Sequence, residues 1–130
     1  MDKLLTGQRI LVVEDEMLIM LMIEDMLADM GCEAVATAAT ANRALSLIEA
    51  QIFDAAMLDM NLNGEDSLAV ADALATRAVP FVFCTGNTGN SKAGDHRDRP
   101  ILRKPFREDD LAAALTRLLF PGELASQIPT

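Results

Sequence analysis

Short apolar runs that alternate with helix-like segments restrict the fold of this chain more than any other feature. Each run is rich in aliphatic or β-branched residues, as expected for strands buried on both faces. Strands that alternate with helices are joined by right-handed crossovers and form a parallel sheet covered on both sides. We therefore predict a doubly wound α/β fold with five parallel strands, at residues 9–13, 33–37, 55–59, 80–85 and 100–104.

Four segments between or after these strands carry helix signals. The first ends at Gly31, and the second follows Thr40, whose hydroxyl is suited to cap it. The last begins with Glu108, Asp109 and Asp110, which are favourable at the positive end of a helix dipole. The predicted helices span residues 17–30, 41–50, 67–77 and 108–120.

Length and charge limit the classes of function that this chain can serve. Its 130 residues suffice for one domain with a core. We place that domain at residues 1–120, followed by a C-terminal tail at 121–130, with no room for an output domain. The net charge of -9 disfavours binding to nucleic acid or to an anionic membrane.

The compartment is predicted from what the sequence lacks. No apolar run has the length of a signal peptide core or a membrane span, so we expect a cytoplasmic protein without membrane insertion. Cys32 and Cys84 have no CxxC spacing, and we expect two small buried thiols in a reducing compartment.

Polar side chains stand at the carboxyl ends of four predicted strands. These ends meet at one edge of a parallel sheet, where open α/β sheets bind ligands. Carboxylates brought together there repel one another unless some bind protons or a cation neutralises them. Hard oxygen ligands of this kind suit Mg²⁺. The residues concerned are Glu14, Asp15, Asp59, Thr85 and Lys104.

The other side chains at this edge are suited to a phosphoryl group. Lys104 can pair with the anion, and the hydroxyl of Thr85 can donate a hydrogen bond to one of its oxygens. A carboxylate can accept such a group as an acyl phosphate. Asp59 is the candidate nucleophile because it ends the central strand, between the acid pair and Thr85. Metal, cation and in-line positioning then supply most of the catalysis.

Four motifs in fixed order, LVVEDE, MLDMNLNG, FCTG and LRKPF, resemble the receiver domain of two-component response regulators. The resemblance spans about residues 8–120, and the set is specific although each motif alone is weak. It implies a flavodoxin-like strand order of 2-1-3-4-5. It also implies a phosphoacceptor signalling protein, not a conventional enzyme, in which a sensor histidine kinase donates the phosphoryl group to Asp59.

The resemblance also implies a magnesium site. Asp15 would bind Mg²⁺ directly and Glu14 through water, and Asp59 and the backbone carbonyl of Asn61 would complete the protein ligands. The implied target is a histidine phosphotransfer protein or the kinase itself. The chain would then serve as a relay, a phosphate sink or a kinase inhibitor.

The family pattern further assigns the phosphoryl contacts and the switch. Thr85, Lys104 and the backbone amide of Gly86 would contact the phosphoryl oxygens, and the bond from Lys104 to Pro105 would be cis. Ile101 replaces the aromatic residue that commonly acts as a switch together with the threonine, so reorientation of a ring cannot be the signal here. FCTG resembles the Phe-Ala-Thr-Gly motif of a subgroup of stand-alone receivers.

The segment between the fourth and fifth strands departs from the regular pattern. Residues 87–98 are rich in turn-forming residues, and each glycine costs about 1 kcal/mol relative to alanine in a helix interior. We predict a short or irregular fourth helix that magnesium and phosphorylation of Asp59 order. His96 has no cysteine or second histidine nearby, and we expect it to be solvated.

The first predicted helix begins with seven successive apolar residues, MLIMLMI. Only about half of a helix circumference can face the core, so some of these side chains should be exposed. Either flanking loops cover them, or they form a docking patch for helices of a kinase's histidine domain. The residues concerned are Met17, Leu18, Met20, Leu21 and Met22.

Two other classes of function compete with this interpretation. A magnesium-dependent aspartyl-phosphate phosphohydrolase acting on small substrates would carry a second acid two residues after the nucleophile, where this chain has Asn61. A nucleotide-binding module would need a GxxxxGK[ST] loop after the first strand, and GNTGNSK at residues 86–92 has neither that spacing nor that place.

Overall fold

The computed structural model describes residues 4–62, 65–86, 96 and 99–121. Five strands form the main sheet: β1 (Arg9–Val13), β2 (Ala34–Ala38), β3 (Ala55–Asp59), β6 (Phe81–Thr85) and β7 (Ile101–Arg103). Four helices accompany them: α1 (Met17–Asp29), α2 (Ala41–Ala50), α3 (Leu68–Thr76) and α4 (Glu108–Leu119).

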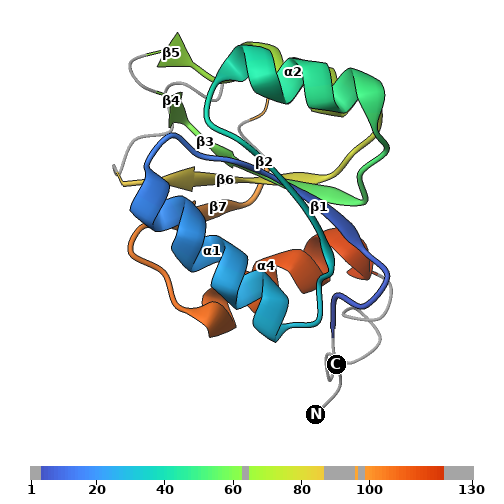
Figure 1. Cartoon of the computed structure of the whole chain (residues 1–130), viewed down its shortest axis with the longest axis vertical. Helices are drawn as coiled ribbons and strands as arrows, with labels where there is room; N and C mark the ends of the chain where they lie inside the picture. Colours follow the sequence, from blue (N-terminus) through green and yellow to red (C-terminus); the bar gives the residue numbers. More distant parts are fainter. Residues whose placement is uncertain (1–3, 63–64, 87–95, 97–98, 122–130) are drawn as a thin grey trace.

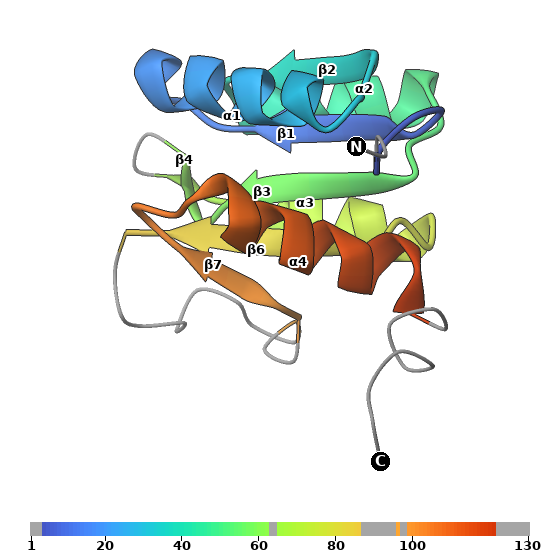
Figure 2. The ribbon, with the colours of Figure 1, turned by 90° about the horizontal axis from the view of Figure 1, so that it is seen from below.

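The main sheet is parallel throughout, and its strand order is β2-β1-β3-β6-β7. Figure 2 shows this order along the sheet, with β2 and β7 at the two edges. Because β6 and β7 are the fourth and fifth strands expected from the sequence, the flavodoxin-like order 2-1-3-4-5 is confirmed. Among the described residues, no helix is long and apolar enough to cross a membrane.

The helices cover both faces of the sheet, as predicted. In Figure 1, α2 lies above the sheet, and α1 and α4 lie below it; α3 shares the side of α2 and contacts it. Successive strand residues alternate between two cores: Ile10 and Val12 pack with α1 and α4, whereas Leu11 and Val13 pack with α2 and α3. Because the strands are buried on both faces of the sheet, their sequences are nearly continuous apolar runs.

Most helix signals in the sequence correspond to observed features. Gly31 follows the end of α1 with φ +90°, a conformation in which glycine has no steric penalty. The hydroxyl of Thr40 accepts a hydrogen bond from the backbone amide of Arg43 at 3.1 Å and so caps α2. The three acids expected at the start of the last helix occupy the first turn of α4.

Two differences from the sequence prediction concern the second strand and the turn after Asp59, and the ends of other elements differ by at most one residue. The second strand is displaced by one residue toward the carboxyl end, because its pairing with β1 in register Arg9↔Ala34 continues to Val13↔Ala38. Where we expected only a turn, β4 (Asn61–Leu62) and β5 (Glu65–Asp66) form a small antiparallel sheet. The predicted irregular fourth helix falls almost entirely on residues outside the described part of the chain.

Four apolar side chains at the start of α1 are exposed, as the helix geometry requires. Their exposed fractions are 69% for Met17, 82% for Leu18, 50% for Leu21 and 38% for Met22. The fifth candidate, Met20, is instead 7% exposed and belongs to the core under α1. Loops of the described chain therefore do not cover this surface, which we call the α1 patch (Met17, Leu18, Leu21 and Met22).

Candidate functional site

Three carboxylates meet at the carboxyl edge of the sheet, as the sequence predicts. Asp59 is the last residue of β3, whose neighbours in the sheet are β1 and β6. Glu14 and Asp15 directly follow β1. One oxygen atom from each of the three side chains lies within 4.8 Å of the other two. Because Glu14 and Asp59 are only 2% and 6% exposed, water screens their repulsion weakly.

Lys104 stands between two of these acids. Its Nζ lies 2.8 Å from Oε1 of Glu14 and 3.3 Å from Oδ2 of Asp59. The backbone amide of Lys104 donates to the carbonyl of Thr85 at 2.8 Å, which fixes the residue just beyond β7. Burial disfavours the ammonium ion, but the hydrogen bond with Glu14 and the charge of Asp59 outweigh burial and raise the pKa of Lys104.

Asp59 remains poorly compensated despite this cation. Its Oδ1 accepts a hydrogen bond from the backbone amide of Asn61 at 3.2 Å, and its Oδ2 accepts one from Lys104. Burial, joined by the negative charge of Glu14, nevertheless raises the pKa of Asp59 to about 7. The site therefore holds more negative charge than the chain itself neutralises, and its carboxylate oxygens fit a hard divalent cation such as Mg²⁺.

Two backbone contacts hold the acidic cluster in place, and the sequence analysis did not identify them. Oε2 of Glu14 accepts a hydrogen bond from the backbone amide of Glu16 at 3.1 Å. The hydroxyl of Ser67, which is buried, donates to the carbonyl of Met60 at 3.2 Å. A serine at a helix start commonly caps its own helix, so the sequence gives no signal that Ser67 instead positions the residue after Asp59.

The remaining predicted residues surround the same edge. Thr85 ends β6 and is buried. Next to it, exposed Gly86 has no atom within 4 Å of the place that a Cβ would occupy, so there is open space beside its backbone. Asn61 lies in β4, with its side chain exposed. Ile101 pairs with Phe83 across β6 and β7 and packs partly against the core under α2 and α3.

A hollow of about 450 Å³ connects the site with α1. Glu16, Ile19 and Met22 line it from the α1 side, and Gly86 and Lys104 line it from the edge of the sheet. Pro105 and Phe106 complete the lining, and the bond from Lys104 to Pro105 is cis, as expected. The apolar α1 patch thus lies beside the acidic edge.

Neither the cysteines nor the histidine contributes a side chain to the cluster of three carboxylates. Cys32 and Cys84 are buried and form no disulfide, as predicted. Burial raises the pKa of Cys84 to about 12, which keeps its thiol neutral.

The prediction that His96 is solvated is wrong: its side chain is 11% exposed, and its Nε2 lies 2.7 Å from Oδ1 of Asp72 on α3. The tertiary fold brings Asp72 to it from 24 positions away.

Comparison with known proteins identifies the family. Residues 10–116 match the model of the response regulator receiver domain. The solution structure of SdrG from Sphingomonas melonis Fr1 is similar, with 48% sequence identity, a TM-score of 0.73, and coverage of 89% of this chain and 98% of that chain. The receiver domain of the sensor histidine kinase PA1611 from Pseudomonas aeruginosa PAO1 has 28% identity and a TM-score of 0.77, covers 88% and 98% of the two chains, and holds a magnesium ion in its active-site cleft.

A longer relative matches only in part. The transcriptional regulatory protein PdtaR of Mycobacterium tuberculosis is 30% identical over 112 residues, which cover 83% of this chain and 55% of that protein. The chain thus spans about half the length of this relative. The family match, the sheet order and the acidic edge agree with one another, and the phosphohydrolase alternative has no support among them. The chain belongs to the response regulator receiver domain family, whose members are phosphoacceptor signalling domains and not conventional enzymes.

Proposed function

We propose that Asp59 accepts a phosphoryl group from the phosphohistidine of a sensor histidine kinase in a magnesium-dependent reaction. One observation carries this proposal: a buried carboxylate ends the central strand beside two other acids and a lysine ammonium. A carboxylate oxygen of Asp59 forms the new bond to phosphorus as the bond from phosphorus to the imidazole nitrogen breaks. The imidazole retains the electron pair of that bond, and an acyl phosphate remains on Asp59.

The proposed metal ligands are Asp15 directly, Glu14 through water, Asp59, and the backbone carbonyl of Asn61. The close approach of the three carboxylates supports this set, as does the magnesium ion in the related PA1611 receiver. When bound, Mg²⁺ supplies positive charge against both the carboxylates and the phosphoryl oxygens.

The proposed phosphoryl contacts come from three neighbouring residues. Lys104, which now shares its ammonium between Glu14 and Asp59, turns toward the phosphoryl oxygens, because these carry more charge than a carboxylate. The hydroxyl of Thr85 and the backbone amide of Gly86 donate to the remaining oxygens. The open space beside Gly86 supports an approach of the phosphoryl group from that side. Because position 101 is isoleucine and not an aromatic residue, we propose that signalling depends on Thr85 without the movement of an aromatic ring.

We propose that the α1 patch and the hollow beside Lys104 receive helices of the kinase's histidine domain. The patch is apolar and exposed, and it adjoins the acidic edge, so a helix docked there can present its histidine to Asp59.

The phosphorylated chain acts by protein contacts or by onward transfer to a histidine phosphotransfer protein, as a relay, phosphate sink or kinase inhibitor. A sink would drain phosphate from the kinase's principal regulator only while Asp59 is intact.

The proposed domain covers residues 1–120, with residues 121–130 as a C-terminal tail. We further propose that the chain belongs to the Phe-Ala-Thr-Gly subgroup of stand-alone receivers and that it acts in the cytoplasm. The two unpaired buried thiols agree with a reducing compartment.

Acetyl phosphate with Mg²⁺ should add one base-labile phosphoryl group to the wild-type chain. Asp59→Asn should abolish the labelling, because the amide cannot act as the nucleophile. Asp25→Asn on the exposed side of α1 is the matched control and should label like wild type. Intact mass with and without base treatment measures the result, and undiminished labelling of Asp59→Asn would refute the proposed acceptor.

Millimolar Mg²⁺ should raise the melting temperature near neutral pH, because it binds the folded cluster and not the unfolded chain. Asp15→Asn should remove most of this increase, whereas Asp25→Asn should leave it unchanged. Differential scanning fluorimetry at several magnesium concentrations gives the comparison. A wild-type melting temperature that does not change with magnesium concentration would contradict the proposed metal site.

Asp59→Asn should stabilise the metal-free chain at alkaline pH. Folding raises the pKa of Asp59 from 3.8 to about 7. Below pH 3.8 the carboxyl is neutral in both the folded and the unfolded chain, and its contribution to the free energy of unfolding is fully present. This contribution is lost as pH rises through about 7, because the buried carboxyl must then ionise. At pH 8 the variant should exceed wild type in unfolding free energy by on the order of 1–3 kcal/mol. Urea unfolding should show a smaller difference at pH 5; equal differences at both pH values would argue against this charge repulsion.

Leu18→Glu should slow phosphotransfer from a histidine kinase that phosphorylates the wild type, while labelling by acetyl phosphate stays unchanged. The substitution places a charge in the α1 patch without touching the acidic edge. Ile52→Glu is the matched control, because Ile52 is 81% exposed and lies outside this patch. Phosphotransfer assays with both donors separate docking from chemistry. Equal transfer to wild type and Leu18→Glu would exclude the patch as the docking surface.

A further inference from the structure

Oxidisable side chains are distributed unevenly between the cores and the surface of this fold. The sequence has eight methionines, two cysteines, and neither tryptophan nor tyrosine, so sulfur atoms are its main targets for mild oxidants. Among the described methionines, only Met17 and Met22 are exposed, at 69% and 38%. The fold shields the other described methionines at least in part: Met20, Met26, Met30, Met57 and Met60.

The two thiols are protected from the same oxidants. Cys32 and Cys84 are buried, and Sγ of Cys32 donates to the carbonyl of Gln8 at 3.5 Å. Burial raises the pKa of both thiols, that of Cys84 to about 12. Cysteine is oxidised through an accessible thiolate, and both thiols lack access and stay protonated. Mild oxidation is therefore directed to Met17 and Met22.

These two methionines are half of the α1 patch. Met17 is the first residue of α1. Met22 lines the hollow of about 450 Å³ together with Gly86 and Lys104, so it also lies beside the acidic edge. Neither methionine is part of the two cores that the described residues form. A change at either sulfur atom therefore alters the patch and leaves the packing of the cores as it is.

The oxidation step needs only a two-electron oxidant of the peroxide class, such as hydrogen peroxide. A lone pair of the methionine sulfur attacks one peroxide oxygen, and the S–O bond forms as the O–O bond breaks. The departing hydroxide takes the proton from the oxygen on sulfur and leaves as water. The sulfur has then lost two electrons, and the peroxide has gained them. The product is methionine sulfoxide, a polar side chain.

A sulfoxide in the α1 patch opposes the docking of an apolar helix face. In the free chain, water binds the sulfoxide oxygen. A docked helix removes this water, and its apolar face offers no donor in return, so binding becomes weaker. Leu18 and Leu21 complete the patch and have no sulfur to oxidise. The reaction thus changes the docking surface only at its two methionines.

We propose that Met17 and Met22 are modification sites for oxidants of the peroxide class, and that their conversion to sulfoxide weakens docking of a histidine kinase at the α1 patch. This inference rests on the docking function proposed above for the patch. Its first part, selective oxidation, is tested without any kinase. Because sulfoxide reductases regenerate the thioether, the change in the docking surface is reversible.

Selective oxidation is tested on the full chain with hydrogen peroxide, and peptide mass spectrometry follows the sulfoxide at each methionine. Met17 and Met22 should be oxidised several-fold faster than the buried Met57 and Met60. In urea, which unfolds the chain, all four should be oxidised at similar rates because the fold no longer shields any of them. Equal rates in the folded chain would overturn the proposal, and so would faster oxidation of either thiol.

The effect on docking is tested with a histidine kinase that phosphorylates the untreated wild type. The receiver alone is treated with peroxide, which is removed before the kinase is added. Phosphotransfer at low receiver concentration should fall by roughly tenfold, whereas labelling by acetyl phosphate should not change. Incubation with methionine sulfoxide reductases should restore the transfer. The double variant Met17→Gln, Met22→Gln, which is polar at both sites, should transfer slowly without peroxide.

Two variants separate these methionines from the others. The double variant Met17→Leu, Met22→Leu keeps the patch apolar but removes both thioethers. Its transfer rate, whatever the starting value, should therefore not respond to peroxide. Met26→Leu is the matched control, because Met26 lies on α1 but outside the patch. This variant should lose transfer on oxidation as the wild type does.

The outcomes distinguish this inference from the proposed docking function. If Leu18→Glu slows transfer but complete oxidation of Met17 and Met22 does not, the patch docks the kinase and the oxidation effect is refuted. If neither change slows transfer, the docking surface fails and this inference fails with it. A response to peroxide that persists without both thioethers would assign the sensitivity to another residue. A parallel fall in labelling by acetyl phosphate would place the damage at the acidic edge, and would equally overturn the proposal.

Discussion

Repulsion among the carboxylates at the carboxyl ends of β1 and β3 is the constraint on which the function of this fold depends. Glu14 and Asp59 are buried where water cannot screen them, and Asp15 completes the cluster. One ammonium, that of Lys104, lies close to both buried acids. It does not balance them, because the pKa of Asp59 stays raised to about 7. The folded chain thus keeps an affinity for further positive charge at the place where a phosphoryl group would also need it.

The parallel sheet makes this repulsion tolerable. Strand residues alternate between one core under α1 and α4 and another under α2 and α3, so most of the stability comes from apolar packing on both faces. The polar side chains at the strand ends, such as Glu14 and Asp59, belong to neither core and are available for chemistry. Backbone contacts, such as that between Ser67 and the carbonyl of Met60, then hold the acids in position at little cost to the cores.

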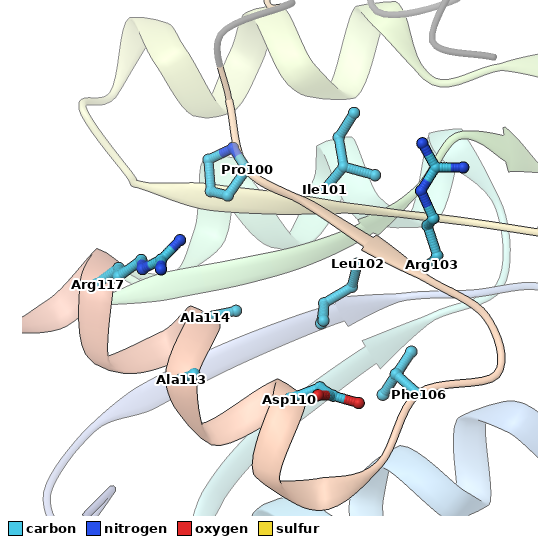
Figure 3. Close-up of a pocket in the computed structure, with 9 residues that line it drawn as sticks. All are labelled: Pro100, Ile101, Leu102, Arg103, Phe106, Asp110, Ala113, Ala114 and Arg117. Carbon is cyan, nitrogen blue, oxygen red and sulfur yellow. The ribbon is translucent and has the colours of Figure 1, made fainter. Parts of the chain in front are cut away.

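The turn after β7 links the acidic edge to the hollow beside α1. Lys104 contacts the acids, and the next two residues, Pro105 and Phe106, line the hollow beside α1. Phe106 also lines a second hollow, of about 460 Å³, between β7 and α4 (Figure 3). Residues 104–106 thus place the lysine that contacts the acids next in sequence to residues that line both hollows.

The sequence by itself determined the order of elements, the parallel sheet and the identity of the polar residues at its edge. Strands that are buried on both faces appear in the sequence as apolar runs. Polar residues such as Asp59 mark the carboxyl ends of four of these runs. The sequence also indicated that some apolar side chains at the start of α1 do not face the core, because only about half of a surface helix does so. Whether loops cover them was left to the tertiary structure.

Only the tertiary structure decided the contacts between distant residues. The sharing of Lys104 between Glu14 and Asp59, the pairing of His96 with Asp72, and the one-residue shift of β2 depend on how strands and helices pack. A local pattern carries no record of these contacts, because the partners are far apart in the chain.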